Sequence, residues 1–202
     1  MINDMTIDQK KTKQETIQTF KQMMIDEINT IPVDDIKEFG LKLLEDVPEY
    51  FFIVPASSSG KYHSKIYLGD GGLVRHSIAV KRMLGHILEG NPANLTDRQK
   101  HLLKLGALFH DCMKSGTQDE YEKNPHTKFL HPAFASLLII GKSIDYEFPY
   151  DDAIFVANAV ASHMGKWNTQ GNKVLPLPET PAQRLFHLAD YLGSRKDVNM
   201  EI

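Results

Sequence analysis

The sequence contains a single cysteine, Cys112, among its 202 residues. One thiol can form neither an internal disulfide nor a cysteine-based zinc site, and low cysteine usage is typical of a reducing compartment. Long apolar runs are also missing: a membrane-spanning helix needs ~18 or more apolar residues, and the most apolar stretch, residues 133–140, is far shorter. The polar segment Met1–Lys13 contains no apolar signal core. We therefore expect a soluble cytoplasmic protein without membrane contacts.

Positive charge is not in excess, because 23 Lys and Arg residues face 26 Asp and Glu residues and the net charge is −3. No global basic field would draw the protein onto duplex nucleic acid. Hydrophobic residues make up 42% and charged residues 24% of the chain, which is ordinary for a globular protein. The length corresponds to one domain, and nothing in the sequence indicates an oligomeric state.

Alternation of polar and apolar residues at period two is absent over any long stretch, whereas helical periodicity is widespread. Two apolar stripes end before Pro32 and Pro48, and we expect them to form a layer, residues 1–50, packed on the core formed by residues 51–202. Further helices are predicted at residues 73–88, from a capping box at Thr96 to about Met113, from His131, at residues 154–163, and from Thr180. The fold class is therefore all-α, a single domain of about seven helices.

The segments between these helices contain glycine, proline and small polar residues, which favour loops. Residues 55–72 and 117–128 are predicted to be loops, and residues 167–178 a loop or a short hairpin. Loops bounded by helices commonly carry binding residues.

Nine histidines against one cysteine are the unusual feature of the composition. Several polar residues lie in apolar helical contexts, where a buried imidazole or carboxylate is costly unless it is paired or binds a metal. These residues are His76, His110, Asp111, His131, His163 and Asp190. A shared metal centre explains them together, because packed helices can direct ligands inward from distant positions. Asp111 could bridge two ions through its two oxygens, whereas a neutral imidazole nitrogen ordinarily binds one.

The ordered set His76, His110-Asp111 and Asp190 resembles the H…HD…D signature of the HD-domain metal-dependent phosphohydrolases. The matching segments are GGLVRHSIAV, LGALFHDCMKSG, HPAFAS, VASHMGKWN and HLADYLGSR. His131 and His163 match two further histidines of the dinuclear branch of that superfamily. The segment KYHSKIYLGDGGLVRHS also resembles the entry to HD domains of bacterial 3′–5′ exoribonuclease-like proteins.

The resemblance implies an HD-type metal-binding catalytic domain over residues 51–202. It implies a first ion bound by His76, His110, Asp111 and Asp190, and a second bound by Asp111, His131 and His163. Lys114 matches the lysine of the HDxxK pattern, which lies beside the substrate phosphate, so Asp111 and Lys114 are the expected catalytic residues. The cofactor is a divalent transition metal, with two ions expected, because imidazole and carboxylate ligands suit Fe, Mn, Co, Ni or Zn.

The implied function is hydrolysis of a phosphomonoester or phosphodiester in a nucleotide or short oligonucleotide by metal-activated water. Two alternatives stay open: an HD-type mixed-valence di-iron oxygenase, and a nucleotide-sensing module with little turnover. Lys114, His63 and Lys166 are the expected substrate-binding residues. Trp167 could stack on a base, although a lone tryptophan after a helix more often packs, and Cys112 is expected to be packed.

Overall fold

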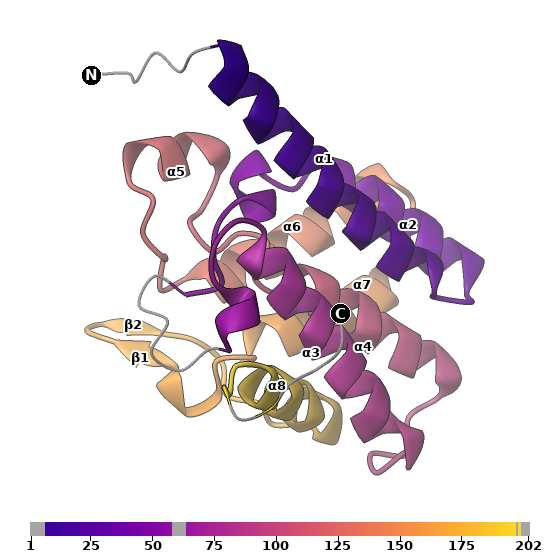
Figure 1. Ribbon diagram of the computed structural model, residues 1–202. Coiled ribbons are helices and arrows are strands. Elements are labelled where there is room, and N and C mark those ends of the chain that lie inside the picture. The colour runs from indigo at the N-terminus through magenta and orange to yellow at the C-terminus, as the bar shows by residue number, and fades with distance from the viewer. Residues whose placement is uncertain (1–6, 58–63, 197, 199–202) are drawn as a thin grey trace.

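The computed structural model describes residues 7–57, 64–196 and 198, and it confirms the all-α fold class (Figure 1). In the described ranges there are eight α-helices, where the sequence predicted about seven. They are α1 (Ile7–Asn29), α2 (Asp34–Glu45), α3 (Gly72–Glu89), α4 (Asp97–Phe109), α5 (Gln118–Lys123), α6 (His131–Asp145), α7 (Tyr150–Ala161) and α8 (Pro181–Gly193). None of the helices in these ranges combines the length and the apolar character needed to cross a bilayer.

Three 3₁₀ helices and one hairpin complete the described secondary structure. The 3₁₀ helices are η1 (Glu49–Phe52), η2 (Lys65–Tyr67) and η3 (Gly165–Trp167), and the hairpin pairs β1 (Thr169–Gln170) antiparallel with β2 (Lys173–Val174). The hairpin agrees with the prediction for residues 167–178. His63, a predicted substrate-binding residue, lies outside the described residues.

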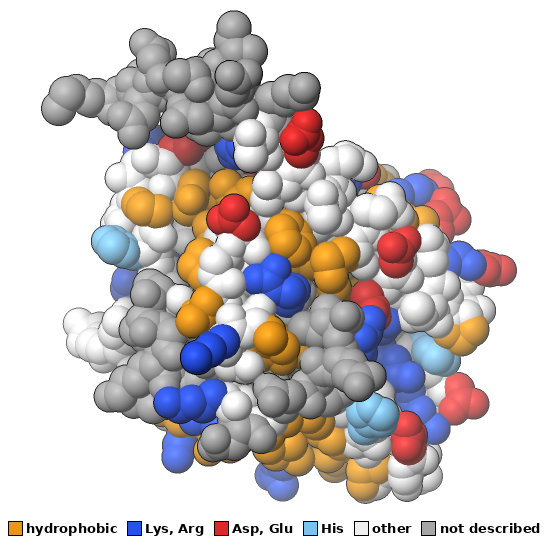
Figure 2. All heavy atoms as spheres, viewed as in Figure 1, with side chains coloured by type: hydrophobic (Ala, Val, Ile, Leu, Met, Phe, Trp, Pro, Cys, Tyr) orange, Lys and Arg blue, Asp and Glu red, His pale blue; other side chains and the backbone are white. Residues whose placement is uncertain are grey.

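α1 and α2 pack side by side along one side of the molecule and contact α3, α4 and α6 (Figure 1). Their apolar stripes are buried as predicted: Ile17, Met24 and Ile28 on α1 belong to the same core as Ile36 and Phe39 on α2. On their outward sides the two signs of charge are interspersed along the right edge of the face in Figure 2. The buried faces of α1 and α2 thus belong to the same core as the other helices.

Inward, α3 packs against α4 and α8, and α4 packs against α7, which pairs with α6. Gly106 on α4 permits the close approach of α7, because a Cβ there would lie 2.9 Å from Cγ1 of Val156. The capping box predicted at Thr96 is present, and Thr180 forms another at the start of α8. These contacts bring together five helices that are far apart in the sequence, α3, α4, α6, α7 and α8.

Two local predictions were wrong. The helix expected to reach Met113 ends at Phe109, and the chain continues in turns through Ser115. The expected loop after Thr117 contains α5, which starts at a capping box formed by Thr117 and Glu120. Helix α5 has no buried residue, so no apolar stripe reveals it in the sequence.

Candidate metal centre

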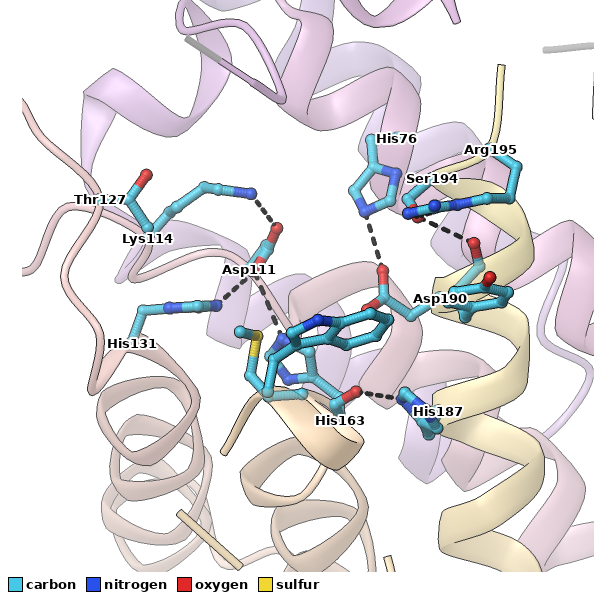
Figure 3. A pocket seen from close by; sticks show the side chains of 13 residues that line it. His76, Asp111, Lys114, Thr127, His131, His163, His187, Asp190, Ser194 and Arg195 are labelled. Atoms are coloured by element: carbon cyan, nitrogen blue, oxygen red, sulfur yellow. Dashed lines mark hydrogen bonds and ion pairs between the residues drawn. The ribbon is translucent and has the colours of Figure 1, made fainter. Parts of the chain in front are cut away.

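The six residues predicted to bind metal come from five helical segments and lie close together. Figure 3 draws five of them, all except His110. His76 lies on α3 and Asp190 on α8, while His131 is the first residue of α6 and His163 follows the end of α7. His110 is the C-cap of α4, and Asp111 begins the turn after it. His110 keeps helical backbone angles, with φ −57° and ψ −35°, so the side chains of His110 and Asp111 diverge as neighbours on a helix do.

Three of the histidines are oriented by the same local contact. In each, Nδ1 lies within hydrogen-bond distance of the backbone carbonyl oxygen three residues earlier: 2.8 Å for His110 to Ala107, 2.7 Å for His131 to Lys128 and 2.7 Å for His163 to Val160. A carbonyl oxygen only accepts, so Nδ1 carries the proton and donates. In the neutral ring the Nε2 atom then presents its lone pair, which is how metal-binding histidines are commonly held.

The Nε2 atoms face the two carboxylates. Nε2 of His131 lies 3.0 Å and Nε2 of His163 lies 3.6 Å from Oδ1 of Asp111. Nε2 of His76 lies 3.1 Å and Nε2 of His110 lies 3.5 Å from Oδ1 of Asp190. The ring centroids of His110 and His163 are only 4.9 Å apart. Four imidazole nitrogens and two carboxylates therefore share one small volume.

The donor set fits a cation. Nε2 of His110 and Oδ1 of Asp111 are buried, and neither makes a hydrogen bond to another described residue. A lone pair facing a carboxylate oxygen is repulsive unless a proton or a metal ion lies between them. Two groups of ligand atoms lie within 4.8 Å of one another: His76 with His110 and Asp190, and His110 with Asp111 and His163.

The electrostatics of the cluster favour positive charge at its centre. Burial opposes ionisation of Asp111, but Lys114 and His110 hold the pKa of this carboxyl well below its usual range. The His110 and His76 imidazoles likewise lower the pKa of Asp190 despite burial. Burial, assisted by His110, lowers the pKa of His163 to about 3 and keeps that ring neutral. Burial opposes protonation of His110, but Asp111 and Asp190 raise the pKa of its imidazole. The ionised carboxylates and the neutral His163 ring are in the protonation states in which metals bind.

A cavity of about 450 Å³ opens over the cluster. In Figure 3, Lys114, Thr127 and His131 lie on one side of it and His76, Ser194 and Arg195 on the other. Nζ of Lys114 lies 2.6 Å from Oδ2 of Asp111, as the one-turn spacing predicted. The volume falls in the usual range of small-molecule sites.

The comparisons with known proteins agree with this geometry. The model of the HD-domain family matches residues 73–194, which include all six cluster residues. The chain belongs to the HD-domain family. No match to the chain was found among curated proteins or among solved structures. HD domains are generally metal-dependent hydrolases, and the His and Asp clusters of this HD domain lie where a metal could bind.

Sequence reasoning missed several residues of the HD domain's cavity. Thr127, Met164, Tyr191 and Ser194 line it. Of these, Met164 and Tyr191 carried a signal in the sequence, because each directly follows a predicted metal ligand. Lys166 is not among the lining residues, and its Nζ lies 4.9 Å from the centroid of Trp167. Cys112 is buried as expected, and burial raises the pKa of its thiol.

Behind the cluster, His187 fixes the backbone of His163. Its Nδ1 lies 2.6 Å from the His163 carbonyl oxygen, to which it donates. His187 thus supports the chain at a candidate ligand, and it also lines the cavity of the HD domain.

Proposed function

We propose that this HD domain is a metal-dependent phosphohydrolase that cleaves a phosphomonoester or phosphodiester of a nucleotide or short oligonucleotide. The observation that carries the proposal is the convergence of four histidine Nε2 atoms and two carboxylates beside a cavity that five of these residues and Lys114 line. A lysine beside a metal cluster is suited to a phosphate oxygen, because both stabilise negative charge.

Each proposed ligand is assigned to one or both of two ions. His76, His110, Asp111 and Asp190 would hold a first divalent ion, and Asp111, His131 and His163 a second. Bound ions of this kind supply an activated water and offset the charge that develops on the phosphoryl group. Imidazole and carboxylate ligands suit Fe, Mn, Co, Ni or Zn.

The protein's own residues would orient the ester. The Lys114 side chain is mostly buried and held at Asp111, so its ammonium is fixed at the cavity wall. From there it can donate to a non-bridging phosphate oxygen. Lys166 and His63 remain proposed contacts to more distant parts of the substrate.

We also propose that the two regions expected from the sequence have different roles. Residues 1–50 would support the fold, and residues 51–202 would form the catalytic HD-type unit. Support comes from the position of the buried α1 and α2 stripes, which pack on α3 and α4 away from the cavity-lining residues.

The decisive variant is Asp111→Asn, which keeps the side-chain size and removes one negative charge from between the two groups of histidines. Asp151→Asn is the matched control, because Asp151 is an exposed carboxylate in the first turn of α7, outside the cavity. We expect Asp111→Asn to lose most bound metal, measured by elemental analysis, and to lose hydrolysis of nucleotide esters. Retention of both metal and activity would refute the proposal.

The same preparations separate the alternatives. A bound iron pair with redox-dependent spectra and no ester hydrolysis would indicate an oxygenase. Tight nucleotide binding without product at saturating Mn or Fe would indicate a sensing module.

A further inference from the structure

The cavity extends beyond the metal cluster to a wall of two aromatic rings. Trp167 and Tyr191 both line it, and their rings are nearly parallel, with centroids 5.8 Å apart and an angle of 15° between planes. Trp167 lies at the end of η3 and Tyr191 on α8, directly after Asp190. Hence the aromatic wall and the proposed metal ligands line the same space.

Two cations flank this wall. Nζ of Lys166 lies 4.9 Å from the Trp167 ring centroid, and Cζ of Arg195 lies 4.5 Å from the Tyr191 ring centroid. Arg195 lines the cavity as well. A wall that combines aromatic faces with positive charge suits a ligand that has both a planar ring and a phosphate.

The wall is held in place before any ligand arrives. The positive φ of Gly165, +55°, lets η3 turn closely against His187, where a Cβ would collide with the imidazole ring. After η3, the side chain of Asn168 donates through Nδ2 to the carbonyl oxygen of Leu175 at 2.8 Å. The backbone carbonyl oxygen of Asn168 accepts from the Leu175 N–H, also at 2.8 Å. These contacts fix both ends of the segment that carries Trp167, yet Trp167 remains 46% exposed.

We infer that Trp167 and Tyr191 form a nucleobase subsite, which places the base of a nucleotide against the Trp167 ring and its phosphate at Lys114 and the metal cluster. This inference rests on the proposed function for the phosphate end only. An exposed tryptophan in a rigid setting loses little entropy when a base stacks on it, which favours binding over a purely structural role.

The test compares substrates that differ only in the base. Ribose 5-phosphate and the nucleoside 5′-monophosphates carry the same phosphate ester, so the ratio of their kcat/KM values measures the contribution of the base. We expect Trp167→Leu to lower this ratio about 5- to 150-fold, the range expected for loss of one base–aromatic stack. Trp167→Phe should keep most of the ratio, and Tyr150→Leu, which removes an exposed aromatic outside the cavity, should not change it.

A binding measurement makes the inference independent of turnover. Trp167 is the only tryptophan in the chain, so intrinsic tryptophan fluorescence reports on this position alone. Nucleoside monophosphates should quench it, and ribose 5-phosphate should not. Quenching without hydrolysis of any ester would support the base subsite and refute the phosphohydrolase. Absence of quenching by every nucleotide, or an equal loss of kcat/KM for both substrate types in Trp167→Leu, would overturn the subsite.

Discussion

The variant Tyr50→Phe tests how the N-terminal part of the chain supports the turn beside the candidate metal centre. Tyr50 lies on η1 and is fully buried. Its hydroxyl donates to the carbonyl oxygen of Gly116 at 2.7 Å and accepts from the backbone N–H of Ser115 at 3.0 Å. Residues 112–116 follow Asp111 directly and include Lys114, so one hydroxyl fastens the end of the turn that presents both side chains.

The magnitude follows from the groups that lose their partner. Phenylalanine keeps the ring, which stacks on Tyr121 with centroids 4.6 Å apart, and removes only the hydroxyl. The Ser115 N–H and the Gly116 carbonyl oxygen would each lose a buried partner, at about 1–3 kcal/mol apiece. Part of this loss is offset, because phenylalanine has no hydroxyl to transfer from water into the protein interior. We expect a net loss of about 2–3 kcal/mol in unfolding free energy, which corresponds to about 4–12 °C in Tm.

Urea unfolding of the full chain, followed by circular dichroism, measures this loss. Tyr121→Phe is the control, because it removes a hydroxyl from the other ring of the same stack, on a side chain that is only partly buried. It should change the free energy of unfolding by less than about 0.5 kcal/mol. If Tyr50→Phe changes stability no more than this control, the hydroxyl does not hold the turn in solution.

The pH dependence of the unfolding free energy is a second, independent test of the role of the Tyr50 hydroxyl. Burial raises the pKa of Tyr50 above its usual 10, although the Ser115 N–H opposes the rise. Above pH ~10 the unfolded chain has released this proton while the folded chain retains it, so the contribution of Tyr50 to stability falls as pH rises. The difference in stability between wild type and Tyr50→Phe should therefore narrow above pH ~10, and a widening difference would contradict the assignment.

Three further perturbations have defined outcomes. Lys81→Met removes an ammonium that lies 2.5 Å from the buried carboxylate of Glu27 and joins α3 to α1. Because Arg82 also pairs with Glu27, the carboxylate keeps one charged partner, and we expect a loss of about 1.5–3 kcal/mol in urea unfolding, against little change for Lys37→Met in an exposed pair. Gly71→Ala places a Cβ against the Phe20 ring at a φ of +66°, and a loss of about 2–4 kcal/mol is expected by the same assay. Removing bound metal with a chelator should lower Tm by about 5–11 °C if the ion had been present at 100 times its Kd, measured by calorimetry before and after re-addition of Mn²⁺.

Local patterns in the sequence predicted most helices, and the failures have physical causes. The stripe from Ile17 to Ile28 and the capping box at Thr96 are contacts between near neighbours, so they are readable from one sequence. Helix α5 has the same kind of capping box but no fully buried residue, so no apolar stripe marks it in the sequence. The Trp167–Tyr191 stack joins residues 24 positions apart on different elements, which no local period encodes.

The geometry of the candidate metal centre also has local and long-range causes. His110, His131 and His163 each direct Nδ1 to the carbonyl oxygen three residues earlier, so the direction of each Nε2 lone pair is set within a single turn of chain. The packing of α4 with α7 and of α7 with α6 then places these three Nε2 atoms near the Asp111 carboxylate. For this reason an ordered set of histidine and aspartate residues can predict that these side chains lie together. The contact between Trp167 and Tyr191 depends on packing alone and is visible only in the folded chain.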